Sequence, residues 1–115
     1  MRFGLSSEVI ARLCQVFARH PEIERVVIYG SRAKGNFRAG SDIDLTFEGD
    51  AIDLPLMLKI ENELDDLLLP YQLDLSILAH IDDADLREHI ARIGQVLYQR
   101  APEARSRIQE PPPRG

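Results

Sequence analysis

Residues 42–47, with the sequence DIDLTF, alternate polar and apolar side chains along a whole strand length. Because successive side chains of a strand point to opposite faces of its sheet, this period of two predicts a strand with one buried face. Asp42 and Asp44 then project from the opposite face to Ile43 and Leu45. The chain is therefore expected to build a sheet with one apolar face and two carboxylates about 6 to 7 Å apart on the other.

Other segments predict the remaining elements of one small domain. Three further runs are rich in β-branched and aromatic or apolar residues and predict strands, the last of them at an edge: 25–29, 72–78 and 95–99. Apolar residues at helical spacing predict three helices: between Ser7 and Pro21, from Asp53 to Leu69, and from Asp82 to Gly94. A short helix is expected to begin near Ser31. This order predicts an α/β (α+β) fold, a small mixed β-sheet flanked by helices.

The length of 115 residues suits a single domain with its own core. We assign that domain to residues 1–100, and we expect residues 101–115, which end in EPPPRG, to be disordered because they carry little apolar surface. No apolar run approaches the about 20 residues of a membrane span, and no signal-peptide h-region is present, so we expect a cytoplasmic protein without a membrane partner. Cys14 is the only cysteine, which excludes an internal disulfide.

A basic, glycine-rich loop joins the first two predicted strands of this acidic chain. The net charge of -5 argues against broad nucleic-acid binding, yet Arg32, Lys34 and Arg38 fall within one loop. Gly30 permits a tight turn, and Ser31 would begin a short helix whose amides and hydroxyl face an anion. These groups suit a triphosphate or a departing pyrophosphate; the alternative is a solvated loop. The Walker A and G-x-G-x-x-G orders are both missing.

A third carboxylate, Asp74, interrupts the apolar strand predicted over residues 72–78. With Asp42 and Asp44 it makes an oxygen-rich set suited to Mg²⁺, and two such ions can clamp an in-line nucleotidyl transfer. In the alternative interpretation, Asp42 caps a turn, Asp44 faces water and Asp74 lies on an exposed strand face. The histidines lie outside these motifs and are interpreted as ordinary surface or helix residues: His20, His80 and His89.

Residues 30–45, GSRAKGNFRAGSDIDL, resemble the signature of the minimal nucleotidyltransferases (MNT) in the DNA polymerase beta-like nucleotidyltransferase superfamily. That signature has Gly-Ser, ten residues, D-x-D, and a third aspartate on a later strand. Residues 32–41 supply the spacing here, and Asp74 stands where the third aspartate is expected. The resemblance continues through DADLREHIARIGQVLYQR and covers about residues 5–100.

The resemblance implies the polymerase beta-like nucleotidyltransferase fold and transfer of AMP from ATP to a hydroxyl, with release of pyrophosphate. It implies three catalytic residues that bind Mg²⁺, with two ions expected: Asp42, Asp44 and Asp74. Asp74 would complete the metal site or deprotonate the acceptor hydroxyl. It further implies nucleotide-binding roles for residues of the loop: Gly30, Ser31, Arg32, Lys34 and Ser41, the last orienting the D-x-D turn.

Stand-alone domains of this family usually accompany a small all-helical partner, the HEPN or substrate-binding protein. In several such HEPN/MNT pairs the partner is a toxin RNase, and the nucleotidyltransferase is an antitoxin that adenylylates a tyrosine of the toxin. The resemblance therefore implies protein AMPylation within a toxin–antitoxin pair. Two alternatives remain: nucleotidyl transfer to a small hydroxylated molecule held by a partner subunit, and a non-catalytic nucleotide-binding subunit.

Overall fold

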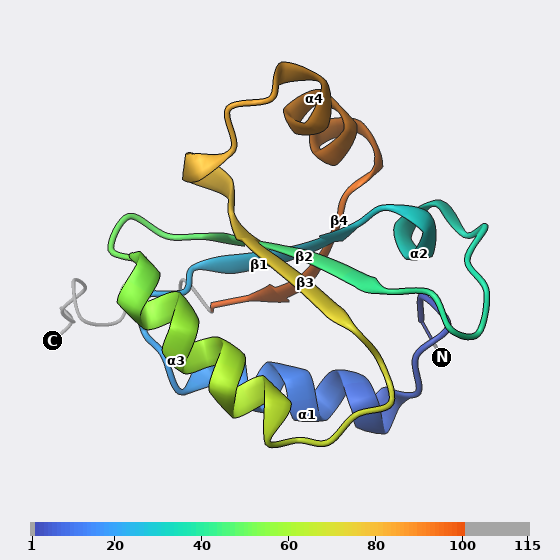
Figure 1. Ribbon diagram of the computed structural model, residues 1–115, viewed down its shortest axis with the longest axis horizontal. Coiled ribbons are helices and arrows are strands. Elements are labelled where there is room, and N and C mark those ends of the chain that lie inside the picture. Colours follow the sequence, from blue (N-terminus) through green and yellow to red (C-terminus); the bar gives the residue numbers. More distant parts are fainter. Residues whose placement is uncertain (1, 101–115) are drawn as a thin grey trace, which may run out of the picture.

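The computed structural model of the chain describes residues 2–100 and contains a mixed four-stranded sheet in the order β3-β2-β1-β4 (Figure 1). β1 (Arg25–Tyr29) lies antiparallel to β2 (Ile43–Glu48) and to β4 (Gln95–Gln99). β3 (Leu73–Ile77) pairs with β2 in parallel. The mixed sheet and the edge position of the last strand confirm the predicted α+β class.

Helices cover both faces of this sheet (Figure 1). α1 (Ser7–Ala18) and α3 (Leu54–Asp65) pack together on one face, and α4 (Ala84–Ile93) lies on the other. The short elements are α2 (Ser31–Lys34) and the 3-10 turn η1 (Leu78–His80). Each long helix begins after a side chain that accepts a hydrogen bond from a first-turn amide, and these caps are Ser6, Asp53 and Asp83.

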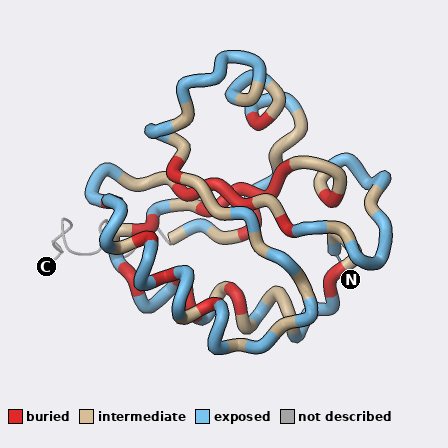
Figure 2. The backbone as a smooth tube through the Cα atoms, in the orientation of Figure 1, coloured by how far each residue is buried: buried red, intermediate tan, exposed pale blue. Residues whose placement is uncertain are grey.

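The main core lies between the sheet and the pair α1 and α3, where buried residues line the inner sides of the elements (Figure 2). Alternate strand residues such as Ile28, Leu45 and Phe47 point into it, and the ring of Phe17 meets that of Phe47 edge to face. Residues of the opposite register face α4, where Val27 and Tyr29 form a smaller cluster with Ile90, a residue of α4. The period of two therefore divides the sheet into a large core face and a second face that α4 covers in part.

Predicted boundaries of β2 and α3 shift in the structure. β2 begins at Ile43 rather than at Asp42, so the first aspartate lies in the connecting loop. α3 ends at Asp65 rather than at Leu69, and Leu68 adopts a left-handed backbone with a φ of 56°, which turns the chain toward β3. The tail predicted over 101–115 lies outside the described residues. Within residues 2–100, no helix is long and apolar enough to cross a membrane.

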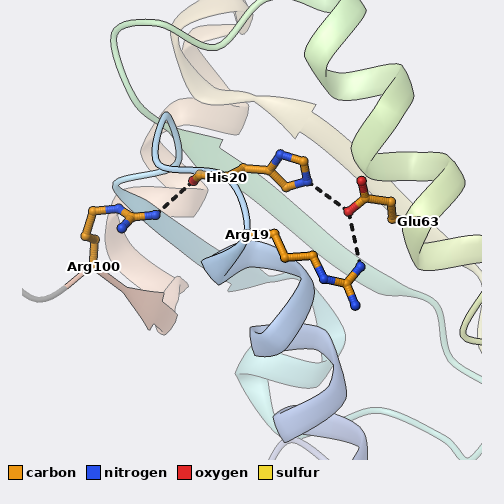
Figure 3. A network of polar contacts seen from close by, with 4 residues as sticks. All are labelled: Arg19, His20, Glu63 and Arg100. Carbon is orange, nitrogen blue, oxygen red and sulfur yellow. Dashed lines mark hydrogen bonds and ion pairs between the residues drawn. The ribbon is translucent and has the colours of Figure 1, made fainter.

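His20 differs from its expected role as an ordinary surface or helix residue. It is buried at the end of α1, with Nε2 2.9 Å from the Glu63 carboxylate on α3 (Figure 3). This hydrogen bond lowers the pKa of Glu63, and Arg19 approaches the same oxygen at 3.5 Å. Arg100 donates to the His20 carbonyl at 2.9 Å, so the cluster joins α1 and α3 to the end of β4.

Candidate active site

The parallel pairing of β2 with β3 places Asp44 directly opposite Asp74. The antiparallel pairing of β1 with β2 places Tyr29 opposite Asp44 on the other side. Because directly paired residues share a sheet face, these three polar side chains form one row across three strands. The row lies on the α4 face, away from the main core, and the two carboxylates meet there as the sequence pattern predicts.

Burial and neighbouring negative charges disfavour the ionisation of Asp44. The pKa of Asp44 is raised, first by burial and then by the negative charges of Asp74 and Asp42, while His89 opposes the shift. Burial also raises the pKa of the Tyr29 hydroxyl; a hydrogen bond to Ser76 acts in the opposite sense, and the two carboxylates add to the increase. A cation placed beside Asp44 would therefore be favoured electrostatically.

The carboxylates do not form a preassembled metal cage. Within residues 2–100, no three His, Cys, Asp or Glu side chains stand close enough together to hold an ion. Asp42 and Asp74 are exposed, whereas Asp44 is half-buried. The donor set itself suits Mg²⁺, because all its ligands are oxygens and because negative charge accumulates around Asp44.

Gly30 brings the loop backbone close to Asp44. It adopts a φ of 76° and a ψ of -154°, a conformation open essentially to glycine, and it caps α2. A Cβ atom at this position would collide with Oδ2 of Asp44, so only a glycine permits this approach. Ser31 then begins α2, and the amides of its first turn have no partner within the helix. The tight turn predicted at Gly30 is present.

Arg32 has a different role from the one expected. Its side chain is buried, with 2% exposed, and its guanidinium donates to the Ser41 carbonyl at 2.9 and 3.1 Å and to the Phe3 carbonyl at 2.8 Å. The guanidinium also packs over the rings of Phe37 and Tyr71. Because Nε, Nη1 and Nη2 all bind protein carbonyls, Arg32 holds the loop together and is removed from the candidate phosphate ligands.

Ser41 shapes the turn that precedes Asp42. Its Oγ accepts a hydrogen bond from the Arg38 amide at 2.8 Å, and its own amide donates to the Arg38 carbonyl at 3.0 Å. The bond from Arg32 to the Ser41 carbonyl fixes the same peptide. Ser41 therefore stands where it can orient the D-x-D segment, whereas Lys34 is exposed at the end of α2.

Two further residues of the site were not predicted from the sequence. Tyr29 ends β1 beside the carboxylates, and His89 of α4, interpreted above as an ordinary residue, accepts a hydrogen bond from the Gly30 amide at 3.3 Å. A signal for His89 exists in the sequence, because it lies three residues after Leu86 and one before Ile90, on the apolar side of the helix. Position on that face indicates a residue directed at the sheet.

The sequence profile of the family described as "Polymerase beta, Nucleotidyltransferase" matches residues 11–103. Among solved structures, a toxin–antitoxin complex with AMP-PNP has 20% identity and a TM-score of 0.63, covering 89% of this chain and 80% of the other. A tri-AMPylated Shewanella oneidensis HEPN toxin in complex with MNT antitoxin gives 15% identity and a TM-score of 0.62, covering 89% and 79%.

A third similar structure is that of "a putative nucleotidyltransferase from Sulfolobus solfataricus". It has 20% identity and a TM-score of 0.51, and the match covers 79% of this chain and 78% of the other. At these identities the structures support the fold alone. No curated protein sequence matches the chain significantly. Because the family profile spans most of the domain, and the fold agrees with it, the chain belongs to the polymerase beta nucleotidyltransferase family.

Proposed function

We propose that this protein transfers AMP from ATP to a hydroxyl of a small helical partner, and that the acceptor is a tyrosine of a HEPN-type toxin, for which the chain acts as antitoxin. The observation that carries the proposal is the direct pairing of Asp44 with Asp74 beside the Gly30 turn. The similar structures include one with AMP-PNP and one with an AMPylated HEPN toxin, which supports this choice of nucleotide and partner.

In the proposed reaction, the acceptor oxygen attacks the α-phosphorus of ATP, the bond to the β-phosphate oxygen breaks, and pyrophosphate leaves. The amides at the start of α2, the Ser31 hydroxyl and the Lys34 ammonium would hold the triphosphate. Asp42 and Asp44 would hold Mg²⁺, which when bound neutralises charge on the phosphate oxygens. Asp74, exposed on the edge strand, would take the proton of the acceptor or complete the ion site.

A docking surface for the acceptor follows the edge strand β3. Three adjoining hollows lie between α3 and β3, and Leu75 lines all of them. The middle hollow, which Asp74 lines, shares Leu73 and Glu61 with one neighbour and Leu54 with the other. On α3, Leu54 and Leu58 are exposed by 64% and 61%, one helical turn apart. Apolar patches of this kind mark interaction sites. We call these hollows together the β3 trough.

The charges around the β3 trough indicate which kind of partner surface would complement it. Its described lining residues include Glu61, Asp65 and Asp74 and neither lysine nor arginine. A helix with an apolar stripe and basic flanks would complement this surface, inserting side chains between Leu54 and Leu58. Such a helix would bring its hydroxyl beside Asp74, so the partner would present the acceptor to the reaction.

The proposal is tested by co-expressing the chain with a small helical HEPN-type protein from the same genome and by measuring intact masses after incubation with ATP and Mg²⁺. We expect AMP on the partner, lost in the Asp44→Asn variant, whose partner regains toxicity. Asp50→Asn, a substitution of an exposed carboxylate outside the site, is the matched control. An unmodified partner beside rapid transfer to a small hydroxylated molecule would favour the small-molecule alternative.

A further inference from the structure

α4 is fixed on the sheet face that carries the candidate active site. Leu86 and Ile90 of this helix pack against Val27 and Tyr29 of β1. Arg87 donates to two carbonyls in the segment that follows β3, those of Leu78 at 2.7 Å and Ile81 at 3.1 Å. These contacts hold α4 at a set position relative to both β1 and β3, so a side chain on its inner face meets the site at a defined point.

His89 of α4 reaches the start of the loop that follows β1. Its Nε2 accepts the hydrogen bond from the Gly30 amide at 3.3 Å. Its ring lies edge to face with the Tyr29 ring, with centroids 6.2 Å apart and an interplanar angle of 78°. Both partners come directly before α2 in the chain. His89 therefore contacts the junction at which β1 ends and the loop begins.

The orientation of the Gly30 peptide matters because Gly30 lies against Asp44. Gly30 has a φ of 76°, and a Cβ atom added to it would clash with Oδ2 of Asp44. Rotation of the peptide would move the first turn of α2 relative to Asp44. The hydrogen bond to His89 opposes this rotation, since it fixes the direction of the Gly30 N–H.

We propose that His89 is a positioning residue: by accepting the Gly30 amide it holds the first turn of α2 at a fixed place beside Asp44. The effect of this positioning on reaction rate rests on the nucleotidyl transfer proposed above. The hydrogen bond between His89 and Gly30 is independent of that proposal. Because the Gly30 amide is taken by His89, the triphosphate is held by the groups that follow it, from Ser31 onward. This role requires no contact between His89 and the nucleotide or the acceptor.

Two substitutions separate the hydrogen bond from the packing of the ring. His89→Phe keeps an aromatic ring against Tyr29 but removes the acceptor, whereas His89→Gln keeps an acceptor near Nε2 but removes the ring. His80→Phe is the matched control for the exchange measurement, because His80 is an exposed histidine on η1. The full chain without nucleotide is used for the first measurement.

The first measurement is amide hydrogen exchange at Gly30, followed by NMR. We expect about three- to tenfold faster exchange in His89→Phe and near-normal exchange in His89→Gln and His80→Phe. The amide of Ile28, in the middle of β1, should exchange alike in all variants and reports that the sheet is intact. Equal exchange at Gly30 in wild type and His89→Phe would overturn the proposal.

The second measurement is the ATP dependence of transfer to the helical partner. We expect His89→Phe to lower kcat/KM for ATP about tenfold at unchanged melting temperature, with His89→Gln restoring most of it. Equal losses in both variants would mean that ring packing alone matters and would overturn the positioning role. If the wild type transfers no AMP, the proposed function fails. The positioning role is then tested by the change that ATP causes in the NMR chemical shift of the Ser31 amide. An identical change in His89→Phe and wild type would overturn that role.

Discussion

Asp44 on β2 and Asp74 on β3 are direct partners in the parallel register, yet their surroundings differ. Asp44 is half-buried beside Gly30 and has a raised pKa, caused first by burial and then by the charges of Asp74 and Asp42. Asp74 is exposed on the edge strand, at the β3 trough. Two neighbouring carboxylates in unlike environments suit the two tasks proposed above, metal binding for Asp44 and a place beside the arriving acceptor for Asp74.

Asp44→Asn is expected to stabilise the fold at neutral pH while abolishing transfer. A carboxyl whose pKa is raised by folding contributes stability below its ordinary pKa, and this contribution is lost as the pH rises through the raised value. Ionised Asp44 therefore lowers the free energy of unfolding at pH 7. Urea unfolding without Mg²⁺ should show a gain in Asp44→Asn at pH 7 that shrinks toward pH 4, and a less stable variant at pH 7 would contradict this.

Arg32 and Lys34, two residues apart, are expected to respond in opposite ways. Arg32→Met leaves the Ser41 and Phe3 carbonyls without their donor, and it should lower the free energy of unfolding by about 2 to 4 kcal/mol. Lys34→Met changes an exposed side chain and should alter stability by less than about 0.5 kcal/mol, while weakening ATP binding. Denaturant unfolding and ATP titration of both variants check the pair, and weaker ATP binding without destabilisation in Arg32→Met would return Arg32 to the phosphate site.

Gly30→Ala should cost about 1 to 3 kcal/mol of stability from backbone strain alone. The added Cβ also meets Oδ2 of Asp44, so kcat should fall together with stability. Gly40→Ala is the control, since its Cβ would meet open space and its φ is not positive. Thermal unfolding and single-turnover transfer measure the two effects. A Gly30→Ala protein with normal stability and rate would refute the close approach of loop and carboxylate.

Leu58→Asp should weaken partner binding by at least about tenfold without unfolding the domain, because it places a charge in the middle of the β3 trough. Leu68→Asp is the control: Leu68 is 87% exposed, lies outside the lining of the trough, and has a left-handed backbone that aspartate tolerates. Titration of the helical partner, followed by calorimetry, distinguishes them. Loss of binding in Leu68→Asp alone would move the interface away from β3.

The sequence alone determined the elements of this protein and the spacing of the signature in its loop. The starts of the three long helices can be predicted from their caps, Ser6, Asp53 and Asp83. A cap accepts a hydrogen bond from an amide only two or three residues away, so the signal is local in the sequence. The alternation in β2 puts Asp44 on the face opposite to the core for the same local reason. The family signature depends on spacing along the chain, so it too can be read without a fold.

Tertiary structure decided which of those residues meet, and therefore what each one contacts. Arg32 looks like a phosphate ligand until the fold brings Phe3, 29 residues away, and Tyr71 to its guanidinium. His89 reaches Gly30 across 59 residues of sequence, through the packing of α4 on β1. Residues this far apart in the chain leave no periodic pattern in the sequence. Their contact arises where separate elements pack together, whereas sequence periodicity reflects the repeat within a single helix or strand. Local geometry fixed the strands, and only their register and the helix that covers them assembled the site.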